Sequence, residues 1–224
     1  MKQKIVLVIA PHPDDETLGC GGTILKHLKN KDQINWLIMT KIELVKNYKK
    51  ITVKKKINEI KRVSKSYKFK SMFRLNFEPA TLDTIPKKDV ITEIQKIIIK
   101  IKPNTIYIPY GGDAHSDHKI TFEACCAISK SFRNKFIKKV IVYETPSETD
   151  FNINPKIKNF KPNLWIDISK QIKQKIKILK IYKTEIGKHP FPRSIENIVS
   201  YSKIRGSVSG HSHAEAFQII KEIQ

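Results

Sequence analysis

Hydrophobic and polar positions along the chain predict strands and helices in alternation. Residues 5–9 form a continuous apolar run, typical of a strand that is buried on both faces of a parallel sheet. Ile57, Ile60 and Val63 recur at helical spacing within residues 51–67, which predicts an amphipathic helix with a very basic outer face. Similar patterns predict strands at 35–40, 72–77, 105–109, 139–144 and 164–168, and helices at 17–28, 90–101 and 119–132. We expect Ser169 to cap a long helix that runs to about residue 186, and the tail to end in a helix at 214–223.

This alternation predicts a single α/β domain covering residues 1–224. Strands that alternate with helices form parallel β-α-β units, which favours a Rossmann-like, doubly wound, mainly parallel sheet flanked by helices. No shift in composition, linker or repeat marks a second domain. In this architecture ligands bind beyond the carboxyl ends of the strands. Two polar loops, after Ala10 and after Pro109, follow predicted strands, so we expect them to form one shared site.

The apolar segments are too short for a membrane protein. No run approaches the roughly 20 residues of a transmembrane helix. The basic start is followed by an apolar stretch at 5–10 that is shorter than the roughly 7–15 residues of a signal-peptide core. We therefore expect no membrane span and a cytoplasmic protein. Cys20, Cys125 and Cys126 fit neither an even disulfide count nor a metal knuckle, which favours small core residues in a reducing compartment.

The net charge of +22 is the strongest feature of the composition. Such an excess is found in proteins that bind nucleic acids or membrane surfaces. Here, however, lysines are spread from Lys2 to Lys221 and accompany Ile and Asn, as an A/T-rich coding bias would produce. The densest run, residues 46–56, contains Tyr48 but no alternating aromatic pattern suited to base stacking. We expect no specific nucleic-acid binding, and attribute the charge to an anionic small substrate or to compositional background.

The first polar loop concentrates charge at the end of a buried strand. His12, Pro13, Asp14, Asp15 and Glu16 put an imidazole and three carboxylates into five residues. Packing so many like charges together is costly unless a cation neutralises some of them. The alternative is an acidic helix N-terminus, where the same carboxylates would interact with the helix dipole.

The second polar loop has His115 and His118 three residues apart, with Asp117 between them. One imidazole could bind a metal while the other faces the space above it; the alternative is a polar capping loop. Together the two loops offer a His, an Asp and a His for a metal, and leave a spare Asp and a spare His. Three protein ligands with an open position are the layout of a catalytic zinc site. Nitrogen and oxygen ligands suit Zn²⁺ best, with Fe²⁺ or Mn²⁺ as alternatives.

At this point the sequence resembles a known family. Residues 10–23, Ala-Pro-His-Pro-Asp-Asp-Glu-Thr-Leu-Gly-Cys-Gly-Gly-Thr, are similar to the first motif of the PIG-L/LmbE family of zinc-dependent N-acetylglucosaminyl deacetylases. His115-Ser116-Asp117-His118 is similar to the second motif. Weaker similarities follow in the family's order at 81–83, 143–147, 165–169, 205–206 and 214–217. The resemblance covers nearly the whole chain, and the two metal motifs are highly specific as a pair.

The resemblance implies a role for each residue of the two loops. It implies three zinc ligands, His12, Asp15 and His118. Asp14 would be the general base that activates the metal-bound water. His115 would stabilise the oxyanion or protonate the leaving amine, and Asp117 would hold His115 in its required orientation and charge state. These roles agree with zinc chemistry, because zinc lowers the pKa of its water towards about 7 and a nearby carboxylate can take the proton.

The sequence departs from the family after the second strand. The family often has an Arg three residues before a Glu, whereas this chain has Lys56 and Glu59, so a bidentate clamp on the substrate is lost or changed. We keep Lys56 as a candidate substrate contact. Residues 41–44 replace the usual glycine-containing loop. Glu144 is either a surface carboxylate at a strand end or a contact to a substrate hydroxyl.

The sequence therefore predicts a zinc-dependent amide hydrolase that removes the acetyl group from an N-acetylated sugar or sugar conjugate. Two alternatives stay open: a metal-dependent amidase acting on a non-sugar acylated small molecule, and a basic binding protein with a non-catalytic metal site. The spare Asp14 and His115 disfavour the second, because a structural zinc needs neither. The identity of the sugar, any nucleotide or lipid attached to it, and assembly into a homo-oligomer are left open.

Overall fold

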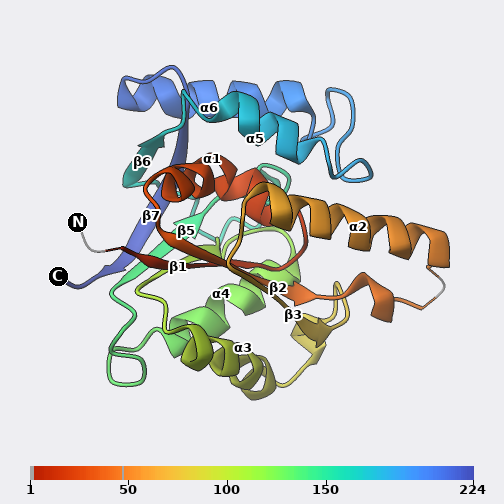
Figure 1. Cartoon of the computed structure of the whole chain (residues 1–224), viewed down its shortest axis with the longest axis vertical. Coiled ribbons are helices and arrows are strands. Elements are labelled where there is room, and N and C mark those ends of the chain that lie inside the picture. Colours follow the sequence, from red (N-terminus) through yellow and green to blue (C-terminus); the bar gives the residue numbers. More distant parts are fainter. Residues whose placement is uncertain (1–2, 47) are drawn as a thin grey trace.

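The computed structural model describes residues 3–46 and 48–224 and contains a seven-stranded sheet with the order β3-β2-β1-β4-β5-β7-β6 (Figure 1). The strands are β1 (Ile5–Ala10), β2 (Gln33–Thr40), β3 (Ser71–Phe77), β4 (Thr105–Pro109), β5 (Lys139–Tyr143), β6 (Leu164–Asp167) and β7 (Ala214–Glu222). The helices are α1 (Asp15–Lys29), α2 (Lys50–Ser66), α3 (Lys87–Ile101), α4 (Ser116–Ile128), α5 (Ile172–Leu179) and α6 (Ile195–Ser209). Short 3-10 turns are η1 (Ile42–Leu44), η2 (Leu82–Thr84) and η3 (Thr149–Phe151).

The first five strands run parallel, as the sequence predicted. β1 pairs with β2 and β4, β2 pairs with β3, and β4 pairs with β5, all in parallel register. β7 runs antiparallel between β5 and β6. The predicted mainly parallel α/β fold is therefore confirmed, with an antiparallel pair at one edge.

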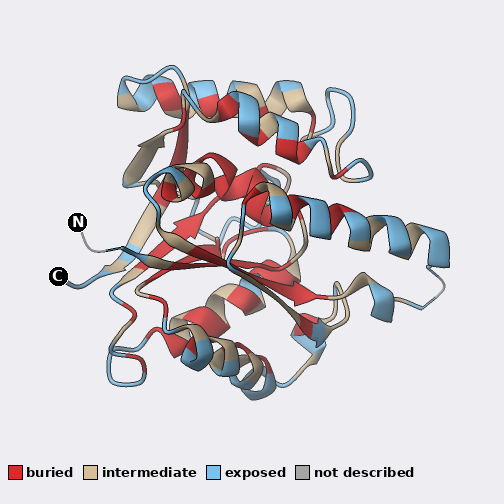
Figure 2. Cartoon of the chain, in the orientation of Figure 1, coloured by how far each residue is buried: buried red, intermediate tan, exposed pale blue. Residues whose placement is uncertain are grey.

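Helices cover both faces of the sheet. α1, α2, α5 and α6 lie on one side and α3 and α4 on the other (Figure 1). Because successive side chains of a strand point to opposite faces, β1 supplies both cores. Val6 and Val8 join the core under α1 and α2, while Leu7 and Ile9 join the core over α3 and α4. Figure 2 shows the resulting pattern, with buried strands and helices that are exposed along their outer sides.

The order of the strands fixes where the site lies. β1 and β4 are neighbours in the sheet, but the chain leaves β1 for β2 on one side and leaves β4 for β5 on the other. The crevice beyond their carboxyl ends is the topological switch point at which ligands bind in such sheets. The loop after Ala10 and the loop after Pro109 both begin there.

The closing helix predicted at 214–223 is wrong. This segment is β7, which forms ladders with β5 on one side and β6 on the other. Its sequence, AEAFQIIKE, has apolar residues at helical spacings as well as β-branched ones, so the pattern alone was ambiguous. Its hydrogen bonds to strands on both sides make this segment a strand.

The predicted helix from Ser169 to about residue 186 is also wrong in extent. Within this range only α5 is α-helical. The Ser169 hydroxyl donates to the Asp167 carboxylate instead of capping α5. The sequence pattern also missed α6 in the turn-rich tail. The buried positions of α6 are Ile198, Ser202 and Gly206. Because Ser202 and Gly206 are not apolar, the helix has no apolar stripe that a sequence pattern could detect. Gly206 is needed there, because a Cβ atom would lie 2.5 Å from the His211 carbonyl oxygen.

Cys20 and Cys125 are buried, as expected of core residues, and Cys126 is partly buried. Among the described residues, no helix combines the length and the apolar character needed to cross a membrane.

Candidate active site

The first loop is held in a strained turn at the start of α1. Asp14 precedes the helix with φ 126°, a conformation rarely adopted by residues other than glycine. The Asp14 carbonyl accepts hydrogen bonds from Thr17 and Leu18, and its N–H donates to the buried Glu16 carboxylate at 3.1 Å. Strain of this kind persists only where the surrounding structure imposes it, and it concentrates at functional sites.

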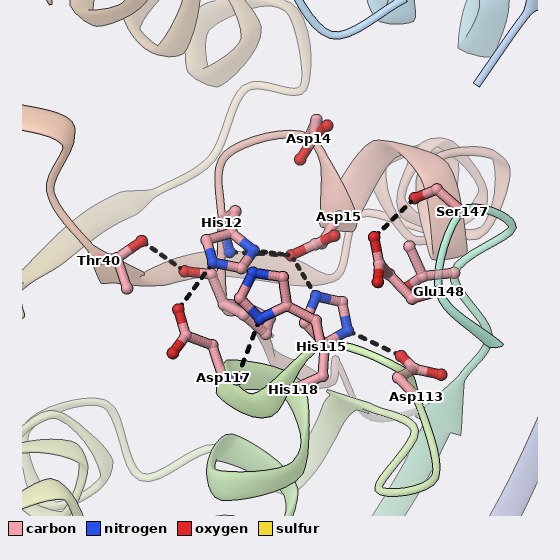
Figure 3. Close-up of polar contacts among 12 residues, drawn as sticks. His12, Asp14, Asp15, Thr40, Asp113, His115, Asp117, His118, Ser147 and Glu148 are labelled. Carbon is pink, nitrogen blue, oxygen red and sulfur yellow. Dashed lines mark hydrogen bonds and ion pairs between the residues drawn. The ribbon is translucent and has the colours of Figure 1, made fainter. Parts of the chain in front are cut away.

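His12, Asp15 and His118 converge within one small volume, with ligand atoms within 4.8 Å of one another (Figure 3). Asp15 Oδ2 lies 3.4 Å from His12 Nδ1 and 3.3 Å from His118 Nε2. Two ligands of a tetrahedral zinc, each about 2.0–2.1 Å from the ion, lie about 3.3–3.4 Å apart. The spacing and the chemistry of these atoms therefore fit the expected zinc ion.

Each of the two histidines is oriented by a carboxylate on its far nitrogen. His12 Nε2 lies 2.9 Å from Asp117 Oδ2, and His118 Nδ1 lies 2.7 Å from Asp113 Oδ2. Asp117 is itself held by the N–H groups of Ala80 and Leu82. Carboxylates in this position fix the tautomer and the ring orientation of metal-binding histidines.

A second cluster, His12, His115 and Asp117, also meets the distance requirement for a metal site. Its atoms are already engaged, however. Asp117 Oδ2 contacts His12 and accepts from Ala80, and His115 Nδ1 accepts from the Asp117 N–H at 3.1 Å. The first cluster is the better metal site, because its facing atoms have fewer competing partners.

The expected role of Asp117 needs a correction. Its carboxylate contacts His12, and only its backbone N–H contacts His115. Burial lowers the pKa of His115 to about 4, with repulsion from His12 and His118 adding to the effect. The contact with the Asp117 N–H also favours a neutral His115 ring over an imidazolium that would protonate the leaving amine. Because Nδ1 accepts a hydrogen bond, the neutral ring carries its proton on Nε2.

Asp14 is buried beside an arginine that the sequence did not single out. Arg193, in the segment between α5 and α6, places a guanidinium nitrogen 3.1 Å from Asp14 Oδ2. Burial and the charge of Asp15 hold the pKa of Asp14 well above its usual range, while the charge of Arg193 opposes them. A carboxylate with a raised pKa is a stronger base than an ordinary aspartate.

A cavity of about 290 Å³ opens over these residues. His12, Asp14, Asp15, His115 and His118 all line it. Further lining residues come from α2, the loop after β5 and the segment after α5; they include Lys56, Glu59, Glu148, Tyr182, Glu185 and Arg193.

The structure places the two candidate substrate contacts differently. Lys56 lines the cavity, where its ammonium group pairs with Glu185. Glu144 does not line it, and both of its carboxylate oxygens bind Arg205, at 2.9 and 2.5 Å. This geometry gives Glu144 a structural partner and no opening towards the cavity, so we leave it out of the proposed site.

Sequence reasoning missed Asp113, Glu148, Glu185 and Arg193. Asp113 could have been found, because it is a carboxylate in the same loop as His115. Glu185 and Arg193 lie more than 160 residues from the first motif and carry no motif of their own, so only folding brings them to the cavity.

Comparison with known proteins identifies the family. The profile described as PIG-L, GlcNAc-PI de-N-acetylase, matches residues 7–129, more than half of the chain. The chain belongs to the PIG-L family. This confirms the resemblance drawn from the two motifs and places the chain among deacetylases, enzymes that hydrolyse amide bonds.

Individual relatives extend the similarity over the whole chain. Diacetylchitobiose deacetylase of Thermococcus kodakarensis is 24% identical, with 98% of this chain and 84% of the relative covered. The conserved protein TT1542 from Thermus thermophilus shares the fold with a TM-score of 0.77 at 20% identity, over 99% of this chain and 97% of that one. N,N'-diacetylchitobiose deacetylase from Pyrococcus horikoshii has a TM-score of 0.76 at 20% identity, over 96% and 83%.

Proposed function

We propose that the chain is a cytoplasmic zinc-dependent deacetylase that hydrolyses the acetamide of an N-acetylated sugar. The convergence of His12, Asp15 and His118, with a carboxylate on the far nitrogen of each histidine, carries this proposal. Such a set can hold Zn²⁺, with Fe²⁺ or Mn²⁺ as alternatives. A zinc ion held there supplies Lewis acidity, which activates water and polarises the amide carbonyl.

Asp14 supplies the base in this proposal. It lines the cavity next to the ligand Asp15, and its raised pKa suits it to accept a proton from the attacking water. The same carboxyl, once protonated, can pass that proton to the leaving nitrogen. Arg193 holds the carboxylate from the other side and favours its ionised form.

His115 supplies a hydrogen bond in this proposal. Its neutral ring has the Nε2 proton free for donation, because Nδ1 accepts from the Asp117 N–H. A fixed donor of this kind stabilises the negative charge that develops on the amide oxygen. The ring lies against His12, with centroids 4.5 Å apart, so it borders the reacting group.

The cavity favours a neutral group as the substrate. Its volume of about 290 Å³ suits roughly one sugar ring with its acetamido group. Its two cations are already matched, since Lys56 and Arg193 both contact Glu185 and Arg193 also contacts Asp14. We therefore replace the earlier expectation of an anionic substrate by an uncharged N-acetylhexosamine unit inside the cavity.

Acetate release from a panel of N-acetylated compounds tests the proposal. Zinc-loaded protein is mixed with N-acetylglucosamine, its short oligomers, N-acetyl amino acids and N-acetyl thiol conjugates. We expect release from one or more sugars, and release at least about 100-fold slower after Asp14→Asn. Release from the amino acids or thiol conjugates alone would identify a non-sugar amidase, and no release from any compound would favour a binding protein.

A further inference from the structure

The helix α2 presents a dense cationic surface beside the cavity. Nine exposed basic residues lie between residues 46 and 68: Lys46, Lys49, Lys50, Lys54, Lys55, Lys61, Arg62, Lys65 and Lys68. The one acid in this range of the sequence is Glu59, which is buried and faces the cavity. Figure 2 shows the outer side of α2 exposed along its length. Like charges at this density repel one another, so the surface favours an anionic partner.

The segment after α5 extends this surface on the other side of the cavity. Its exposed cations, together with those of α5 itself, are Lys173, Lys177, Lys180, Lys183 and Lys188. The one acid between residues 170 and 193 is Glu185, which lines the cavity. The two basic segments are in contact, because the N–H of Lys183 donates to Glu59 and Lys56 pairs with Glu185. We call the exposed cations of 46–68 and 173–188 the basic rim.

The basic rim differs from the opposite side of the molecule in the acids that lie among its cations. α3 carries Asp89 and Glu93 among its four lysines. Lys87 pairs with Glu123 and Lys96 with Glu93, although Lys88 there has no ion pair with a described residue. Among the residues that the structure describes, no exposed cation of the rim forms an ion pair; Lys56, which does, points into the cavity. The rim is therefore a field of unmatched positive charge and not a mixed, self-neutralised surface.

Apolar side chains are exposed among these cations. Leu44, Tyr48 and Ile51 stand at the start of α2 and just before it, and Ile51 is 60% exposed. Phe191 is exposed on the other side, where its ring packs against Arg193 of the cavity wall. Lysines that surround a few exposed aliphatic and aromatic side chains are typical of surfaces that bind anionic bilayers. Nucleic-acid binding would instead favour aromatic residues interleaved as stacking platforms, which the described part of the rim lacks.

We propose that the basic rim docks on the surface of an anionic lipid bilayer, with Leu44, Tyr48, Ile51 and Phe191 entering the headgroup region beside the mouth of the cavity. The lysines supply electrostatic attraction, and the four apolar side chains supply contact that salt does not screen. This inference rests on the surface alone and is independent of the proposed deacetylase activity.

Vesicle binding tests the proposal. The full chain is sedimented with phosphatidylcholine vesicles, with or without about one third phosphatidylglycerol, at about 0.15 M salt. We expect binding to the anionic vesicles only. The variant Lys54→Glu/Lys55→Glu/Lys61→Glu should lower the partition coefficient at least about 100-fold, since each lysine near an anionic surface contributes about fivefold. Deacetylation of a small soluble substrate should stay unchanged, because none of the three lines the cavity.

The matched control places the same charge change on the opposite side. Lys88→Glu/Lys130→Glu/Lys135→Glu alters three exposed lysines of α3 and of the connection after α4, and it should lower binding by less than about fivefold. A second pair of variants compares an exposed apolar residue of the rim, in Ile51→Ser, with one outside the rim, in Phe132→Ser. Only Ile51→Ser should weaken vesicle binding. Equal losses in the two triple variants would overturn the proposal. So would no vesicle binding by the wild type, or duplex DNA binding through the rim without vesicle binding.

Discussion

At the scale of the residue, the carboxylates of the proposed site differ in what holds them. Asp113 and Asp117 are tied to histidines, and Asp117 also to backbone N–H groups, so they orient the ligands. Asp14 is different, because its carboxylate contacts the guanidinium of Arg193 and faces the cavity. These contacts explain why Asp14 can act as a base while Asp113 and Asp117 orient histidines, although all three have the same side chain.

The split between ligand and base can be tested by Asp14→Asn. The change removes the base without removing any of the three ligands, so kcat should fall by about 10²–10⁴ while metal content stays near one ion per chain. Elemental analysis and single-turnover acetate release measure the two effects. As a matched control, Asp15→Asn should lose metal affinity itself. If Asp14→Asn emptied the site, Asp14 would be a ligand and the roles proposed above would be wrong.

His115→Ala tests the hydrogen-bond donor. We expect kcat to fall by about 10²–10³, the usual loss for an oxyanion-stabilising group, with a much smaller change in KM. Burial lowers the pKa of His115 and its Nδ1 accepts a hydrogen bond, so we expect a neutral ring throughout the neutral pH range. The loss should therefore be the same at every pH from about 6 to 9, as steady-state kinetics across that range would show. A loss that appeared only below about pH 7 would indicate a protonated His115 and contradict the neutral donor.

The candidate ligands could be predicted from the sequence because they lie in two short motifs. Each ligand lies in the loop after a buried strand or in the first turn of the helix that follows it, and the parallel sheet brings both segments to one edge. The contacts of Asp117 and the approach of Arg193 were not predictable, because they depend on side-chain directions and on a segment far away in the sequence.

At the scale of the element, β7 fastens α1 and α5 to the sheet. Glu215 on β7 accepts hydrogen bonds from the N–H groups of Gly22 and Thr23, at 2.8 and 2.7 Å. Lys175 on α5 pairs with the same carboxylate at 2.7 Å and donates to the Leu18 carbonyl. All of these residues are buried. The contact holds the helix that carries Asp15 against the last strand.

Glu215→Ala should therefore lower the free energy of unfolding by about 3–5 kcal/mol, because it leaves a buried ammonium group without its counter-charge. Urea denaturation measures the change. Glu222→Ala, on the same strand, removes the exposed pair with Lys139 and should cost less than about 1 kcal/mol. Adding Lys175→Met to Glu215→Ala should recover part of the loss. Equal losses for Glu215→Ala and Glu222→Ala would show that the buried contact has no special importance.

The elements that the sequence predicted have a regular apolar pattern, and the elements that it missed do not. β1 and α3 are evident from the sequence, since every position of one is apolar and Val90, Ile94 and Ile98 recur at helical spacing in the other. α6 buries Ser202 and Gly206, and β7 has a pattern that suits either structure. In both cases tertiary contacts, and not local pattern, determine the element.

At the scale of the whole molecule, the net charge of +22 comes from cations outside the cavity. The acids Asp14 and Glu185 match the two cations of the cavity, while the densest exposed cations lie outside it, on the rim. A neutral sugar unit can therefore enter the cavity while a negatively charged surface is held next to it. The composition predicted the excess of positive charge. Only the fold shows which cations pair with acids in the cavity and which are exposed without an acidic partner.

This charge should not give sequence-specific nucleic-acid binding. Affinity for duplex DNA should fall steeply as salt rises from about 0.05 to 0.2 M and should not differ between sequences, because it would come from phosphate contacts alone. Fluorescence anisotropy with several labelled duplexes measures both properties. Tight binding of one duplex that persisted at high salt would contradict this expectation.

Titration of the metal-depleted chain with Zn²⁺, followed by acetate release from its N-acetylated sugar, tests the central claim most directly. His12, Asp15 and His118 form one site, so activity should be absent after chelation and rise linearly to a plateau at one Zn²⁺ per chain. His118→Ala should shift the curve to much higher Zn²⁺, since it removes a ligand. Full activity in the chelated protein, or a plateau that required two ions per chain, would contradict the account.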